Sequence, residues 1–200
     1  MTSFQRCEPE LLDALGRHSA AVVGDAMDRF GALDSKIQAT WPAGRVVGNA
    51  YTVWTRAGDN LAIHQALDLI EPGDVLVVNG YADETRALIG EMLGIKAKTR
   101  GLAGFVLDGA ARDIAELQEL GMPAFARAVT PAGPYKNGPG HLALPIAAGG
   151  VCVHPGDAVL GDGDGVVVVP REQLGDTLTR ADAIVENEKR KRVQNAVPIR

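Results

Sequence analysis

Apolar residues recur along this chain at helical and at strand spacing, and the two spacings alternate through its first half. Helical spacing predicts two helices joined by a short turn within residues 8–30, with Ser19 capping the second and Gly31 stopping it. Runs rich in β-branched residues predict strands at 45–55, 74–78 and 103–107. A helical pattern follows each of these strands, and the helices are expected at 60–70, 90–100 and 113–120. Gly101 and Gly121 stand where the last two should end.

Alternation of strand and helix is typical of parallel strands covered by helices, but the second half of the chain departs from it. Short strands separated by Gly, Pro and Asp turns are predicted at 124–129, 151–153, 157–160 and 166–169. Residues 161–165 (GDGDG) are typical of a hairpin connection. Residues 171–193 predict a long charged terminal helix. We therefore expect one domain over residues 1–200, a three-layer mixed α/β or β/β/α domain with a long C-terminal helix.

Composition and charge narrow the classes of partner. The 200 residues are 46% hydrophobic and 22% charged, as in an ordinary folded domain, and the net charge of −5 argues against a nucleic-acid partner. The N-terminus lacks the apolar segment of a signal peptide and no stretch is apolar enough to span a membrane, so a cytoplasmic protein is expected. Cys7 and Cys152 lie far apart and favour neither a disulfide framework nor a thiolate zinc site.

Several catalytic chemistries lack the residues that they need. None of the three serines stands in a GxSxG motif, and the four histidines form no HExxH arrangement. Neither a GxGxxG after a strand nor a P-loop is present, and none of the six lysines lies in a predicted strand, which argues against Schiff-base chemistry. The GDGDG segment lacks the terminal glutamate of a calcium loop.

One constellation remains, and it lies after two successive strands. Gly90 and Glu91 begin a predicted helix, whose first N–H groups have no partner within the helix. Arg112 and Asp113 follow the next strand, at the sheet edge where open α/β sheets bind ligands. If the two strands are adjacent and parallel, one small carboxylate can contact both segments while Asp113 offers oxygen ligands to a hard divalent cation. Spacing alone equally allows Asp113 to be a simple helix cap and Arg112 its solvated partner.

At this point the sequence resembles a known family. The segments GDNLAIHQALDLIEPGDVLVV, AKTRGLAGFVLDGAARD, ELGMPAFARAVTP and GDGDGVVVVPRE are similar to class II 4-hydroxy-4-methyl-2-oxoglutarate aldolases and to their relatives, the regulators of ribonuclease activity A, over roughly residues 19–190. The aldolase branch is marked by an acidic residue, twenty intervening residues and then Arg-Asp. Glu91 and Arg112-Asp113 keep that spacing, with Glu where the family more often has Asp.

The resemblance implies a role for each residue of the constellation. Backbone N–H groups of Gly90, Glu91, Met92 and Leu93 would bind the substrate carboxylate, Arg112 would bind the 2-oxo acid, and Asp113 would hold Mg²⁺ or Mn²⁺. Glu91, or Glu188 or Glu186 from a neighbouring subunit, would act through water on the metal. The family fold is a swivelling β/β/α domain that assembles as homotrimers or hexamers with sites between subunits.

The activity that this implies is metal-dependent cleavage of 4-hydroxy-2-oxo acids, of the 4-hydroxy-4-methyl-2-oxoglutarate or 4-carboxy-4-hydroxy-2-oxoadipate type, to pyruvate and a second oxo acid. Oxaloacetate decarboxylation is the expected side activity, since it passes through the same enolate. The alternative is a non-catalytic protein that regulates ribonuclease E by binding. Arg112-Asp113 with an acid at the earlier position favours the enzyme, because binding alone does not require this constellation.

Overall fold

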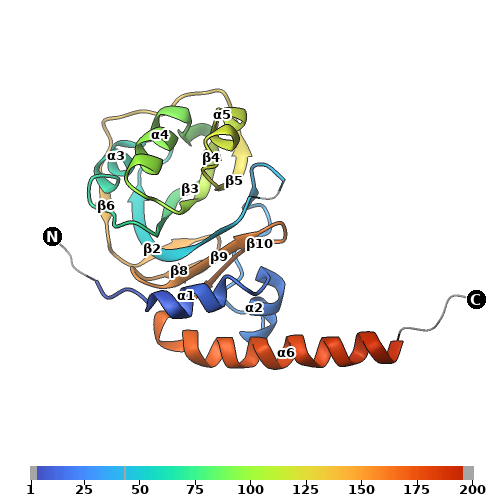
Figure 1. Cartoon of the computed structure of the whole chain (residues 1–200). Coiled ribbons are helices and arrows are strands. Elements are labelled where there is room, and N and C mark those ends of the chain that lie inside the picture. Colours follow the sequence, from blue (N-terminus) through green and yellow to red (C-terminus); the bar gives the residue numbers. More distant parts are fainter. Residues whose placement is uncertain (1–3, 43, 196–200) are drawn as a thin grey trace, which may run out of the picture.

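A mixed sheet runs through the centre of the molecule (Figure 1), which the computed structural model describes for residues 4–42 and 44–195. The strand order is β1-β5-β4-β3-β2-β9-β10, and β6 pairs with β2 outside this path. Neighbours among β2, β3, β4 and β5 are parallel, and the other pairs are antiparallel. The strands are β1 (Gln38–Ala39), β2 (Val46–Thr55), β3 (Asp74–Ile89), β4 (Gly104–Ala111), β5 (Ala124–Val129), β6 (Gly140–Leu142), β9 (Ala158–Asp162) and β10 (Gly165–Val169).

Strand β2 is shared between two sets of partners. One of its edges pairs with β3 from Asn49 to Trp54. On the other edge, the first part of β2 pairs with β9 and the last part with β6. The separate hairpin of β7 (Ile146–Ala148) and β8 (Val151–Val153) packs its apolar residues with those of β9 and β10. The sheet is thus covered on both faces, which explains why all eight residues of β4 are buried and why all but Asp108 are apolar or glycine.

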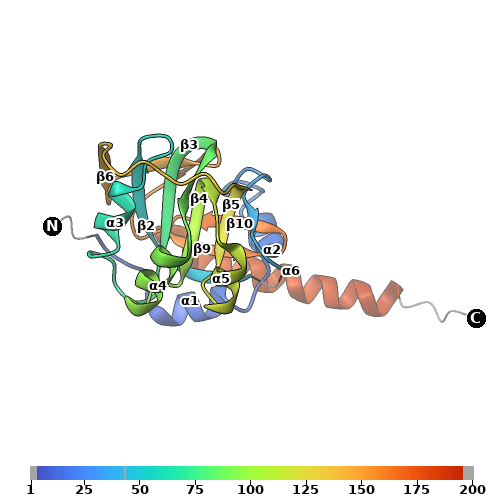
Figure 2. The same ribbon diagram turned by 90° about the horizontal axis from the view of Figure 1, so that it is seen from above.

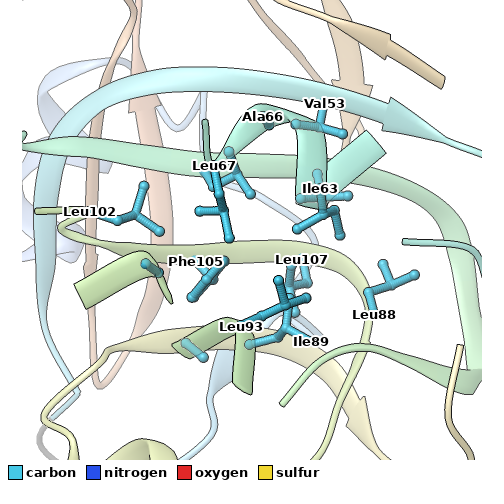
Figure 3. Packing of buried hydrophobic residues seen from close by; sticks show 14 of the residues in the cluster. Val53, Ile63, Ala66, Leu67, Leu88, Ile89, Leu93, Leu102, Phe105 and Leu107 are labelled. Carbon is cyan, nitrogen blue, oxygen red and sulfur yellow. The ribbon is translucent and has the colours of Figure 1, made fainter. Parts of the chain in front are cut away.

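Three short helices cover the face of the sheet opposite this hairpin. They are α3 (Leu61–Ala66), α4 (Glu91–Thr99) and α5 (Ile114–Glu119). Figure 3 shows Ile63 and Leu67 from the α3 segment and Leu93 from α4 meeting Phe105 and Leu107 of β4. Phe105 and Leu107 are fully buried, so this packing fixes where α3 and α4 begin relative to the ends of the strands.

The remaining helices form a second helical layer, beneath β9 and β10 in Figure 1. They are α1 (Pro9–Leu15), α2 (Ala20–Ala26) and α6 (Leu174–Asn195), the last preceded by the 3₁₀ turn Arg171–Gln173. The first turns of α6 pack through Leu174, Leu178 and Ala181, and its second half extends past the body of the molecule (Figure 2). In the part of the chain that the structure describes, no helix has both the length and the apolar character needed to cross a membrane.

Most of the predicted organisation is confirmed. The sheet is mixed, the long C-terminal helix is present, and β9 and β10 form the predicted hairpin. Ser19 caps α2 by accepting a hydrogen bond from the N–H of Val22 at 3.3 Å. Gly101 and Gly121 follow α4 and α5 with φ of +78° and +62°, the left-handed conformation in which glycine ends a helix without steric cost.

Three expectations about elements were wrong. Helix α2 ends at Ala26, well before Gly31, because Asp28 and Arg29 have positive φ and break the helix. Strand β3 continues to Ile89 instead of ending at 78, with register shifts against β4 after Asn79. Strands β1, β6 and β7 were not predicted, since none of them carries the β-branched pair that marked the equally short β8 (VCV).

Candidate functional site

The site is built where β3 and β4 end side by side. Their last residues, Ile89 and Ala111, are register partners in the parallel ladder. The N–H of Arg112 donates to the carbonyl of Ile89 at 3.1 Å, which continues the pairing one residue beyond the strands. Gly90 and Arg112 are therefore neighbours in space, and the expected adjacency of the two segments is confirmed.

The backbone turns at Asp113, and the carboxylate of this residue contacts the neighbouring helix α4. Its φ of +55° is left-handed, a conformation that Asp tolerates better than most residues. Asp113 is the N-cap residue of α5, yet its side chain makes no capping hydrogen bond there. Instead Oδ2 accepts a hydrogen bond from the N–H of Glu91 at 3.0 Å, at the first turn of α4. Asp113 is thus the N-cap residue of α5 by position, but its carboxylate bonds the first turn of α4 and not that of its own helix.

The guanidinium of Arg112 lies beside this carboxylate. Its Nε is 3.5 Å from Oδ2 of Asp113, and among the described residues the Arg112 side chain makes no hydrogen bond. Two glycines leave room for it, because a Cβ on Gly133 would lie 3.1 Å from Nη1, and one on Gly90 would overlap the Asp113 carboxylate. With 41% of the side chain exposed, Arg112 presents free donors to the cavity.

A third segment closes the site from the side of β2. The start of α3 is joined to the loop after β5 through two backbone hydrogen bonds, Asn60 N–H to Tyr135 at 3.0 Å and Tyr135 N–H to Gly58 at 2.8 Å. The buried carboxylate of Asp59 accepts from the N–H groups of Asn137 at 3.0 Å and Gly138 at 2.7 Å. Burial raises the pKa of Asp59, but these N–H donors outweigh it and the pKa is lowered. An ionised Asp59 thus holds the loop that carries Lys136 against α3.

These segments enclose one cavity. Its lining comes from the ends of β3 and β4, the first turns of α3 and α4, and the loop after β5. The lining residues are Asn60, His64, Leu88, Ile89, Gly90, Met92, Leu93, Arg112, Asp113, Pro134 and Lys136.

The cavity favours an anionic ligand. Arg112 and Lys136 are its cations, Asp113 is its only carboxylate, and Lys136 makes no ion pair with a described residue. The pKa of His64 is lowered, first by burial and then by Lys136 and Lys96, so the imidazole is neutral at pH 7. The first N–H groups of α4 add partial positive charge, because Met92 and Leu93 have no carbonyl four residues back within the helix. A small carboxylate is the ligand that this arrangement suits.

The predicted site residues divide into two groups. Gly90, Met92, Leu93, Arg112 and Asp113 line the cavity as expected. Glu91 starts α4 but is not among the lining residues, so its predicted catalytic role stays a prediction.

Glu186 and Glu188 lie on the second half of α6. That helix is on the opposite side of the sheet from α4 and α5 (Figure 1), and the two glutamates pair along it with Lys189 and Arg192. The chain does not bring them to its own cavity, and a contribution from a neighbouring subunit stays a prediction.

Three polar lining residues were missed from the sequence: Asn60, His64 and Lys136. The sequence marks Asn60 only as the start of a predicted helix, and His64 belongs to no HExxH arrangement. A usable signal existed for the first two. They are four residues apart on a helix that follows β2, whose carboxyl end lies at the same sheet edge as those of β3 and β4. Lys136 gives no such signal, since it lies in a loop positioned by Asp59.

The donor set is compatible with a hard divalent cation. Asp113 uses Oδ2 toward Glu91, and its Oδ1 makes no hydrogen bond with a described residue. No group of three or more His, Cys, Asp or Glu side chains able to hold a metal occurs within residues 4–42 and 44–195. One carboxylate completed by substrate oxygens and water suits Mg²⁺ or Mn²⁺, whereas a structural zinc site would need more protein ligands.

Fold and site together define a mixed α/β domain with a cavity at the carboxyl edge of its parallel strands, lined by two cationic side chains and one carboxylate. The family model described as RraA-like, Aldolase/RraA, matches residues 20–168. The chain belongs to this family.

Relatives within the family carry two kinds of name. A protein of Halalkalibacterium halodurans, provisionally named a 4-hydroxy-4-methyl-2-oxoglutarate aldolase, is 43% identical over 159 residues, covering 80% of this chain and 76% of that one. The 4-hydroxy-4-methyl-2-oxoglutarate aldolase of Thermus thermophilus is 37% identical over 117 residues, covering 58% and 71%. The structure of Streptomyces coelicolor RraAS2, described as an unusual member of the RNase ES inhibitor RraA family, superposes with a TM-score of 0.85 at 30% identity, covering 94% and 100%.

Proposed function

We propose that this protein is a divalent-metal-dependent carbon–carbon lyase. It cleaves 4-hydroxy-2-oxo acids, of the 4-hydroxy-4-methyl-2-oxoglutarate or 4-carboxy-4-hydroxy-2-oxoadipate type, to pyruvate and a second oxo acid, and it decarboxylates oxaloacetate as a side activity. The observation that carries the proposal is the contact of the Asp113 carboxylate with the N–H of Glu91, beside the free guanidinium of Arg112. The names of the aldolase relatives agree with it.

Three groups of the cavity take part in this reaction: the first N–H groups of α4, Arg112 and Asp113. The open N–H groups at the start of α4 bind the substrate carboxylate. Arg112 donates to the 2-oxo group and offsets the negative charge that develops on its oxygen as the enolate forms. Asp113 would hold Mg²⁺ or Mn²⁺, which when bound supplies a Lewis acid that polarises the 2-oxo group. The same charge stabilisation serves loss of CO₂ from oxaloacetate, because both reactions leave a pyruvate enolate.

The alternative is a non-catalytic role like that of the RraA regulators, in which the protein would bind ribonuclease E. The superposition with Streptomyces coelicolor RraAS2 is the observation in its favour. A purely regulatory role gives no reason for a cavity in which the Arg112 side chain lies without a hydrogen bond beside Asp113. We therefore place the catalytic role first, with a small 2-oxo acid as partner and a homotrimer or hexamer as the assembly.

The deciding experiment is a coupled assay of pyruvate release from a panel of 4-hydroxy-2-oxo acids and from oxaloacetate. We expect turnover to be lost on treatment with a chelator and restored by Mg²⁺ or Mn²⁺, because Asp113 is the one carboxylate that lines the cavity and would hold the metal. Pyruvate release that continues undiminished in metal-stripped protein contradicts the class II mechanism. Absence of release from every substrate favours the regulator.

A further inference from the structure

Helix α3 opens with an asparagine that does not cap it. Asn60 is the N-cap residue, a position where an asparagine side chain normally accepts a hydrogen bond from the first turn. Here Asp59 takes over that function, with its Oδ1 accepting from the N–H of Leu61 at 2.9 Å. The Asn60 side chain instead crosses to β3, where Nδ2 donates to the carbonyl of Leu88 at 3.0 Å.

This hydrogen bond fixes the orientation of the Asn60 amide. A carbonyl oxygen only accepts, so the nitrogen of Asn60 faces Leu88 and the oxygen faces away from it. Asn60 is 3% exposed, and its Oδ1 is buried without a hydrogen-bond partner among the described residues. Buried polar atoms are nearly always paired, because an unpaired one loses its water without compensation. The missing partner of Oδ1 is a hydrogen-bond donor, since an amide oxygen can only accept.

The position of Asn60 indicates what that donor is. Asn60 lines the cavity together with Arg112 and Asp113, and so does His64, one helical turn later, whose Nε2 is likewise buried and unpaired. In a 4-hydroxy-2-oxo acid at neutral pH, the carboxylate and 2-oxo oxygens are acceptors only. The hydroxyl on C4 is the one donor of the carbon chain that such a substrate offers.

We propose that Asn60 binds the C4 hydroxyl of the substrate through Oδ1 and so selects hydroxylated 2-oxo acids. The inference rests on the proposed function and adds to it the residue that recognises the carbinol carbon. Asn60 is not the base that removes the hydroxyl proton, since an amide oxygen is too weak a base. It holds C4 in place, while Arg112 holds the 2-oxo group on the other side of the C3–C4 bond that breaks.

The test compares two reactions of the same enzyme preparation. Oxaloacetate carries no hydroxyl on a tetrahedral C4, so its decarboxylation serves as the internal reference. Asn60→Leu keeps the size of the side chain and removes both the Oδ1 acceptor and the Nδ2 donor to Leu88. Loss of the donor affects both reactions, so kcat/KM for cleavage of 4-hydroxy-4-methyl-2-oxoglutarate should fall at least about tenfold more than kcat/KM for decarboxylation. The inhibition constant of 2-oxoglutarate, which lacks the hydroxyl, should stay within about twofold.

Two further variants distinguish a loss of substrate recognition from a general disturbance of the site. Asn79→Leu is the matched control, because it makes the same substitution at a half-buried asparagine whose Oδ1 is already paired with the N–H of Tyr81 at 2.8 Å. It should change both reactions by the same factor. Asn60→Asp keeps an oxygen acceptor of the same size and should retain more of the preference for the hydroxylated substrate, and it provides the test if Asn60→Leu does not fold.

The outcomes distinguish the two proposals. A native protein that cleaves no 4-hydroxy-2-oxo acid overturns the proposed function, and this inference with it. A native protein that cleaves the substrate, while Asn60→Leu lowers cleavage and decarboxylation equally, overturns the role of Asn60 alone. The same holds if Asn60→Asp loses the preference as fully as Asn60→Leu does.

Discussion

At the residue scale, the proposed reaction depends on the guanidinium of Arg112, whose side chain makes no hydrogen bond with a described residue. Its planar fork can donate two hydrogen bonds to one substrate, whereas lysine offers a single point charge on a flexible chain. We predict that Arg112→Lys lowers kcat/KM for pyruvate release on the order of 10²-fold or more, as the loss of an oxyanion donor does. Steady-state kinetics with a circular dichroism check of folding measures this. Near-parental kinetics in a folded variant contradicts the role.

The two cysteines differ in reactivity for a reason that is also local. Burial, as the main cause, raises the pKa of the Cys7 thiol to about 11, and its Sγ lies 3.4 Å from the carbonyl of Gly156. Cys152 is exposed, and both cysteines are free. We predict that the native protein at pH 8 reacts through one thiol per chain with a colorimetric disulfide reagent, and through two after denaturation. Cys152→Ser should abolish the native signal, and a native signal that persists in this variant contradicts the expectation.

At the scale of elements, Gly90 sets how closely α4 approaches the end of β4. A Cβ there would overlap Oδ2 of Asp113 and lie 3.0 Å from Cγ of Arg112. Gly90 has extended backbone, so alanine costs nothing in φ and acts through this overlap alone. We predict that Gly90→Ala displaces the Asp113 carboxylate and lowers kcat/KM on the order of 10²-fold.

A matched substitution checks the reason for this effect. Gly175 in the first turn of α6 has nothing within 4 Å of an added Cβ. Gly175→Ala should therefore retain activity and, as a helical glycine replaced by alanine, lose no stability. Equal effects of Gly90→Ala and Gly175→Ala on kcat/KM contradict the steric explanation.

The sequence predicted those parts of the site that follow strands with a clear apolar pattern. The runs before Gly90 and Arg112 placed both segments at one sheet edge, and the ladder of Ile89 with Ala111 confirms it. The later part of β3 was missed because Tyr81 and Ala82 have positive φ and the polar residues around them do not alternate. Asn60 was missed for another reason: its acceptor, the carbonyl of Leu88, is 28 residues away in the chain, and local capping patterns carry no information about it.

At the scale of the whole molecule, the position of α6 separates Glu188 from the cavity. The helix lies on the opposite face of the sheet from α4 and α5, so Glu188 can act on the site only from a neighbouring subunit. We predict that Asp113→Ala and Glu188→Ala, each inactive alone, regain partial activity when their subunits are exchanged, because some interfaces then combine an intact Asp113 with an intact Glu188. Mass spectrometry of differently labelled subunits verifies the exchange.

The control is a chain that carries both Asp113→Ala and Glu188→Ala. Exchange of subunits among copies of this double variant should restore no activity. Verified exchange without recovery contradicts a shared site and makes Glu186→Ala the next variant to mix.

Chains shortened after Asp182 keep the buried Leu174, Leu178 and Ala181, and should therefore fold and lose turnover.

The sharing of β2 between β3 and β9 affects how the chain is made. Val46 and Asn49 have their register partners at Gly161 and Ala158. This edge of β2 therefore stays unpaired until most of the chain has been synthesised. Until then it displays unpaired backbone groups, on which another nascent chain can add a strand. Synthesis that stalls before Ala158 therefore leaves a species prone to aggregation. Once β9 has been synthesised, it pairs with this edge of β2 and the backbone groups are no longer exposed.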